Sequence, residues 1–98
     1  MATVARLMKK LTQRQLEVMA VLYAYPHCNA SLLADLLCVS KQCVHEHCSN
    51  IYHKLDARNR LDLLLWCKEN DLGSVLQELL PEDVQKRAQA RGLARRAF

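Results

Sequence analysis

Glycine and proline are scarce in this chain of 98 residues, with two of each, and aromatic residues make up 5% of it. Sheet-rich folds and flexible segments draw heavily on glycine, proline and β-branched or aromatic residues, whereas leucine and alanine favour helices. About half of the residues are apolar, which suffices to bury one compact core. The composition therefore predicts a single, small, all-α domain.

Long apolar runs and a regular cysteine framework are also absent. No run approaches the roughly 20 apolar residues that span a bilayer, and the N-terminus lacks the pattern of a secretory signal peptide. The cysteines are odd in number and lie within helical patterns: Cys28, Cys38, Cys43, Cys48 and Cys67. We therefore expect free, mostly buried thiols and a cytoplasmic protein without membrane contact.

The net charge of +4 is modest but unevenly distributed. Basic residues cluster near the N-terminus, around residues 54–60, and beyond residue 85. Such clusters suit a polyanion such as DNA. Solvated helix faces would have a similar composition, so charge alone leaves both interpretations open.

Apolar residues at helical spacing predict four helices in the first 70 residues. Thr12 and Gln15 form a capping box for the first helix, which Pro26 ends. The second covers roughly residues 30–37. Ser40 is the predicted N-cap of a third helix over about residues 41–55, and Asn59 that of a fourth over about residues 60–70.

The segment after the fourth helix predicts a short helical extension. Gly73 is the expected helix stop, and Pro81 is expected to start a further helix with acidic residues in its first turn. We expect Leu76, Leu79 and Leu80 to cover the fourth helix or to extend a dimer interface. The final basic residues are expected to be mobile unless bound. The predicted organisation is an N-terminal arm (1–10), a domain (11–70) and a C-terminal helical extension with a basic tail (71–98).

The second and third predicted helices carry the pattern of a helix-turn-helix. Ala34 is the small residue that permits a close crossing, and apolar residues at fixed offsets supply the core between the helices: Leu33, Leu37, Val39 and Val44. The N-terminal half of the third helix would then project into a DNA major groove, which is about 12 Å wide.

The stretches "LTQRQLEVM" and "LADLLCVSKQCVHEHCSNIYHKLDARNRLDLLL" resemble the LuxR-type (GerE-like) helix-turn-helix domain of bacterial transcription regulators. The opening LTxRExEVL pattern is matched at Leu11, Thr12, Arg14, Glu17 and Val18, and further matches follow at Ala34, Leu37, Ser40, Val44, His47, Ile51, Lys54, Leu55 and Arg60. The resemblance covers about residues 11–68. It implies a four-helix DNA-binding unit whose third helix enters the major groove and whose fourth often dimerises.

These patterns assign three sets of candidate residues. The predicted base-reading residues are Gln42, His45, Glu46 and Ser49. The predicted phosphate-binding residues are Lys41, Lys54, Arg58 and Arg60. The fourth helix is apolar nearly all round, so one face should meet either a partner or the C-terminal segment, and we interpret it as a dimer interface comprising Leu61, Leu64, Leu65 and Lys68.

Some residues depart from the family pattern. Cys43 stands where a threonine is usual, and His45 and Ser49 stand where basic residues are common. Glu46 adds a negative charge, which weakens phosphate binding unless the carboxylate accepts a hydrogen bond from cytosine N4. His47 is expected to be a packing or capping residue, and Arg60 to pair with a carboxylate if it does not bind phosphate.

The predicted function is a stand-alone bacterial transcription regulator that binds double-stranded DNA as a homodimer. The alternative is a DNA-independent modulator, an anti-activator or co-regulator, that binds another regulator or RNA polymerase. Zinc could be held by Cys43, His47 and Cys48 with His27–Cys28, but no C-x2-C spacing occurs. No orienting acid accompanies the histidines as catalysis would require. We expect no cofactor, metal, small-molecule ligand or enzymatic activity.

Overall fold

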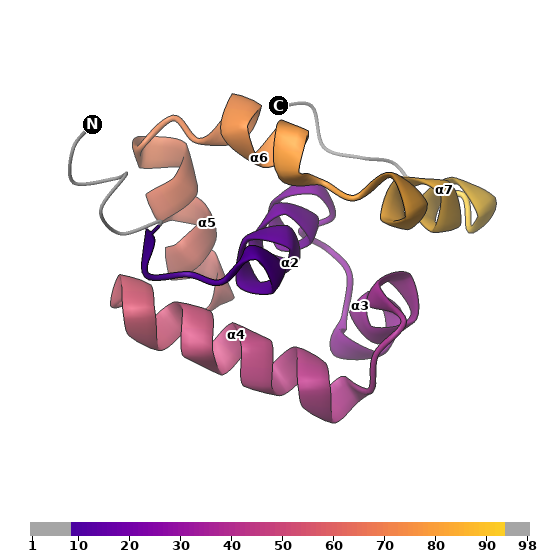
Figure 1. Cartoon of the computed structure of the whole chain (residues 1–98), viewed down its shortest axis with the longest axis horizontal. Coiled ribbons are helices and arrows are strands. Elements are labelled where there is room, and N and C mark those ends of the chain that lie inside the picture. Colours follow the sequence, from indigo (N-terminus) through magenta and orange to yellow (C-terminus); the bar gives the residue numbers. More distant parts are fainter. Residues whose placement is uncertain (1–8, 94–98) are drawn as a thin grey trace.

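The computed structural model describes residues 9–93, and all regular secondary structure in that range is helical (Figure 1). The all-α prediction is therefore confirmed. Helix α2 lies between α4 and α6 and also contacts α3 and α5, whereas α7 packs against α3. The helices are α2 (Gln13–Ala24), α3 (Ala30–Leu37), α4 (Lys41–Leu55), α5 (Arg60–Glu69), α6 (Gly73–Leu79) and α7 (Glu82–Ala90).

Helix α2 is buried on every side over its second half. Each residue from 18 to 25 is at most 7% exposed. A helix that is apolar all round must be covered all round, and the helices of the first 70 residues leave one side open. Helix α6 covers that side with Leu76 and Leu80, both buried. Leu76, Leu79 and Leu80 were expected to cover the fourth helix or to extend a dimer interface. The first alternative is corrected, because α6 packs chiefly against α2, and the second stays a prediction.

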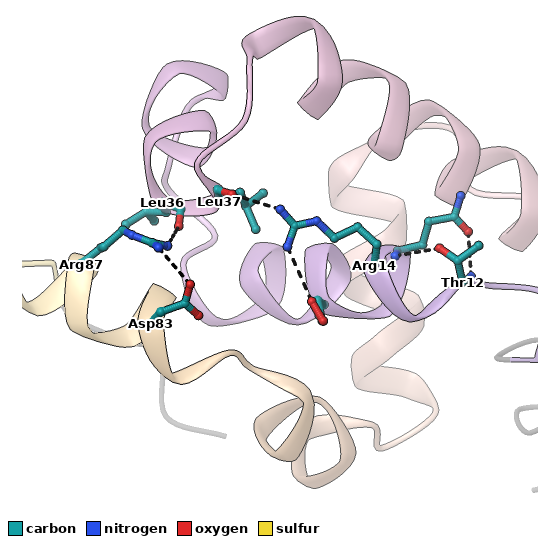
Figure 2. A network of polar contacts seen from close by, with 8 residues as sticks. Thr12, Arg14, Leu36, Leu37, Asp83 and Arg87 are labelled. Carbon is teal, nitrogen blue, oxygen red and sulfur yellow. Dashed lines mark hydrogen bonds and ion pairs between the residues drawn. The ribbon is translucent and has the colours of Figure 1, made fainter.

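Side-chain caps set where the helices begin. The Thr12 hydroxyl accepts a hydrogen bond from the Gln15 amide, and the Gln15 side chain accepts one from the Thr12 amide, both at 3.1 Å (Figure 2). Ser40 caps α4 and Asn59 caps α5, as predicted. Asn29, which the sequence pattern did not single out, caps α3 by accepting from the Leu32 amide at 2.9 Å.

Helices α3 and α4 end in left-handed C-caps that are not glycine, Cys38 and Asp56, each with φ of 56°. Asp71, which follows the Asn70 C-cap of α5, is left-handed as well, with φ of 52°. The predicted helix stop at Gly73 is wrong, because α5 already ends at Glu69 and Gly73 is the first residue of α6. Asp71 makes this turn because a short polar side chain tolerates the left-handed region.

The last described helix follows the prediction closely. Pro81 is the N-cap of α7, and Glu82 and Asp83 occupy its first turn, where they complement the positive end of the helix dipole. The expectation of a mobile basic end falls partly on residues 94–98, which lie outside the described residues. No helix within residues 9–93 is both long and apolar enough to cross a membrane.

We predict that Cys38→Gly stabilises the protein by about 1 kcal/mol, because glycine occupies the left-handed region without the steric cost that a Cβ imposes there. Denaturant unfolding measures the change. Cys43→Gly is the control, since Cys43 lies inside α4 and glycine there should destabilise. Equal effects of the two substitutions would contradict the argument.

Candidate nucleic-acid interface

Helices α3 and α4 pack together as a helix-turn-helix, joined by residues 38–40. Ala34 is buried, at 6% exposure, and its small side chain allows the two helices to approach closely. Leu33, Leu37 and Val44 are buried with it. The Ser40 hydroxyl accepts from the Cys43 amide at 3.1 Å, so α4 begins immediately after the turn. The helix-turn-helix predicted from the sequence is confirmed in its helices and its packing.

Helix α4 has one buried and one exposed face. Val44, Ile51 and Leu55 face the core. All four predicted base-reading residues are exposed, and their spacing places them along one face of the helix: Gln42, His45, Glu46 and Ser49. Asn50 and His53 continue the same stripe and are also exposed. The sequence interpretation assigned no role to these two residues, although Asn50 lies four residues after Glu46 and His53 four residues after Ser49, which would have identified them.

Two of the predicted base-reading residues are linked to each other. The Gln42 side-chain amide donates to the Glu46 carboxylate at 3.3 Å. One turn separates them on the helix, so the contact satisfies part of the carboxylate and orients the amide. The pair therefore presents a carboxylate and a carboxamide side by side on the exposed face.

An open groove of about 450 Å³ runs beside the exposed face of α4, where the helix meets α3. His45 and Ser49 line it on the α4 side together with Cys48 and Tyr52. Ala30 and Leu33 of α3 line it as well. The groove is mostly apolar, and it brings apolar surface next to two of the polar residues predicted to read bases.

The predicted phosphate-binding residues differ in whether their charged groups lie at the surface or are hydrogen-bonded within the fold. Lys41 is exposed at the start of α4. Arg58 is exposed, and its Nε donates to the Asp62 carboxylate at 3.0 Å. That hydrogen bond is the main cause that lowers the pKa of Asp62. Both cations lie at the surface, where a phosphate group could approach them.

Lys54 and Arg60 are instead engaged within the fold. Lys54 donates from Nζ to the side-chain oxygen of Gln15 at 3.0 Å, which ties α4 to the first turn of α2. Arg60 donates to the backbone carbonyls of Cys28 and Tyr25, the latter at 2.8 Å. The carboxylate partner considered for Arg60 is replaced by these two carbonyls. Phosphate binding by Arg60 remains a prediction that its contacts argue against.

The predicted dimer residues lie along the outer side of α5. Leu61 is 65% and Leu65 47% exposed, and Lys68 is exposed as well. Leu64 is half-buried and packs against the core. The buried side of α5 carries Leu63 and Cys67. The C-terminal extension leaves Leu61 and Leu65 uncovered, because α6 packs chiefly against α2.

The cysteine chemistry considered from the sequence finds little support in the geometry. Within residues 9–93 no three His, Cys, Asp or Glu side chains are grouped so that they could hold a metal ion. All five thiols are free. Burial raises the pKa of Cys28 and Cys48, and it raises that of Cys67 to about 12. These three thiols therefore stay protonated at neutral pH, which makes them poor nucleophiles and poor metal ligands.

These features define a helix-turn-helix protein whose second motif helix presents an exposed polar face. The family described as "Bacterial regulatory proteins, luxR family" (GerE) matches residues 9–67, more than half of the chain. The chain belongs to this family of DNA-binding transcription regulators, as the sequence resemblance indicated. No curated protein and no solved structure matches it. Helices α6 and α7 lie beyond the matched residues.

We predict that Arg60→Ala lowers the free energy of unfolding by about 2 kcal/mol or more, because two backbone carbonyls lose charged donors. Arg58→Ala removes a side chain that is 86% exposed and paired with a surface carboxylate, so it should change this free energy much less. Denaturant unfolding of both variants measures the difference. A similar small loss for both would show that Arg60 does not hold the segment between α2 and α3.

Proposed function

We propose that the chain is a stand-alone transcription regulator that binds double-stranded DNA as a homodimer, with α4 in the major groove. The observation that supports this most is the stripe of exposed polar side chains along α4, opposite a face buried in the core. A major groove admits one α-helix, and base edges are read by such hydrogen-bonding side chains. The family membership supports DNA binding independently.

Sequence preference is assigned to Gln42, His45, Glu46 and Ser49. A carboxylate reads cytosine by accepting from N4, whereas a carboxamide can pair with adenine. Because Gln42 donates to Glu46, the two side chains act on neighbouring bases as one unit. His45 and Ser49 border the apolar groove, which suits contact with a thymine methyl group.

Affinity is assigned chiefly to Lys41 and Arg58. Each contact between a cation and a phosphate strengthens binding by counterion release. Lys54 can contribute while it remains bound to Gln15, since an ammonium group has three donors. Arg60 supports the site by holding the segment between α2 and α3 through the carbonyls of Tyr25 and Cys28.

Glu46→Ala should change the preferred base at one position of each half-site, a preference worth about 1–3 kcal/mol. It should also raise affinity for unrelated DNA, because a negative charge beside the phosphates is removed. Selection from a random DNA pool, followed by binding at two salt concentrations, measures both effects.

The matched control for this selection is Glu78→Ala, which removes an exposed carboxylate from α6. It should leave the selected sequence unchanged. If the unaltered protein enriches no sequence and binds DNA only weakly, the proposal that α4 reads the DNA sequence fails. The DNA-independent modulator, bound to another regulator or to RNA polymerase, would then be the better description.

We also propose that α5 forms the dimer interface through Leu61, Leu64, Leu65 and Lys68. The replacement of Leu61 and Leu65 by Asp together should convert the dimer to a folded monomer, because two buried carboxylates oppose association. Sedimentation velocity measures mass, and circular dichroism verifies the fold.

Val75→Asp is the control for this experiment, since Val75 is a 40% exposed apolar residue on α6. It should leave the dimer intact. A monomeric unaltered protein, or a double variant that remains dimeric, would rule out the α5 interface.

A further inference from the structure

Two backbone carbonyls at the C-terminal end of α3 accept hydrogen bonds from arginine side chains of two different helices. A helix leaves its last four carbonyls without partners inside the helix. In α3 the amides of Cys38 and Val39 bond back to the carbonyls of Ala34 and Asp35. The remaining two carbonyls, those of Leu36 and Leu37, face outward from this turn and accept from arginine side chains (Figure 2).

Arg14 of α2 donates from Nη2 to the Leu37 carbonyl at 3.0 Å. Arg87 of α7 donates from Nη1 to the Leu36 carbonyl at 2.7 Å. Both cations lie at the negative end of the α3 dipole, where positive charge is stabilising. A charged donor also makes a stronger hydrogen bond than a neutral one. The end of the first motif helix is therefore held from two sides.

Arg87 is itself held in this orientation. Its Nη2 donates to the Asp83 carboxylate at 2.9 Å, one turn earlier on α7 (Figure 2). An ion pair at 3.4 Å between Arg91, the C-cap of α7, and Asp35 of α3 joins the two helices as well. Val84 and Ala88 are buried on α7, and α7 packs against α3. Helix α7 thus presents one arginine to one carbonyl at a defined position.

We propose that Arg87 is a positioning residue for DNA reading: it fixes the end of α3, and with it the turn that sets the direction of α4. The connection between the helices is residues 38–40, so little chain separates the Leu36 carbonyl from the Ser40 cap. Arg87 lies outside the residues that match the family. The DNA-reading unit of this protein therefore extends through α7. The inference rests on the proposed function, since it assigns Arg87 an effect on sequence selectivity.

The test compares Arg87→Ala with Lys86→Ala. Both substitutions remove one positive charge from α7, but Lys86 is 75% exposed and pairs only with Glu82 at 3.9 Å. Amide hydrogen exchange, measured without DNA, reports the opening of the turn at Cys38 and Val39. The ratio of affinities for the selected DNA sequence and for an unrelated sequence reports selectivity. Arg87→Lys, which keeps the charge and a donor, is the conservative variant.

Arg87→Ala should accelerate exchange at Cys38 and Val39 by about tenfold relative to the amides of α2. The loss of one charged hydrogen bond changes the equilibrium constant for opening the turn by about that factor or more. Arg87→Ala should also lower the affinity ratio severalfold, whereas Lys86→Ala should change neither quantity. Arg87→Lys should restore part of both. If Arg87→Ala does not fold, hydrogen exchange and the affinity ratio are compared between Arg87→Lys and Lys86→Ala instead.

Uniform acceleration of exchange in all helices, with an unchanged affinity ratio, would reduce Arg87 to a contributor to global stability and overturn the proposal. Equal behaviour of Arg87→Ala and Lys86→Ala would overturn it as well. If the unaltered protein selects no DNA sequence, the proposed function fails and the selectivity role falls with it. The exchange data would then still show whether Arg87 holds the turn.

Discussion

The arrangement of the other helices follows from the burial of α2. Its residues from 18 to 25 are apolar and must be covered on every side. Helices α3, α4 and α5 cover part of this surface, and α6 covers the side that they leave open. Residues beyond the family-matched range therefore belong to the same hydrophobic core. Helix α7, which follows α6, packs against α3.

A second consequence of this packing is the way in which the basic residues are divided. Arg14, Lys54, Arg60 and Arg87 donate to carbonyl oxygens within the protein. Their main effect is to hold helix ends and connections together. Their charges remain, but part of their hydrogen-bonding capacity is used within residues 9–93 and is not free for a phosphate group. Lys41 and Arg58 remain at the surface.

Much of the local structure could be predicted from the sequence. The capping residues Thr12, Ser40 and Asn59 and the apolar spacing located α2, α4 and α5, because caps and periodicity are local properties. The prediction failed at Gly73, where a left-handed Asp71 ends the turn after α5. It also missed Asn50 and His53, although each lies four residues after a predicted base-reading residue and therefore on the same helix face. Arg87 had no local signal at all, because its partner carbonyl lies 51 residues away.

Three features could be predicted from the amino-acid sequence without coordinates: the all-α class, the helix-turn-helix, and the residues that begin the main helices. These follow from composition, spacing and hydrogen bonds between residues three or four apart. Three further features became visible in the folded chain: α6 covers α2, Leu61 and Leu65 of α5 stay exposed, and Arg60 and Arg87 donate to backbone carbonyls. Those outcomes depend on which surfaces meet when the helices pack, and contacts between distant residues leave no periodic trace in the sequence.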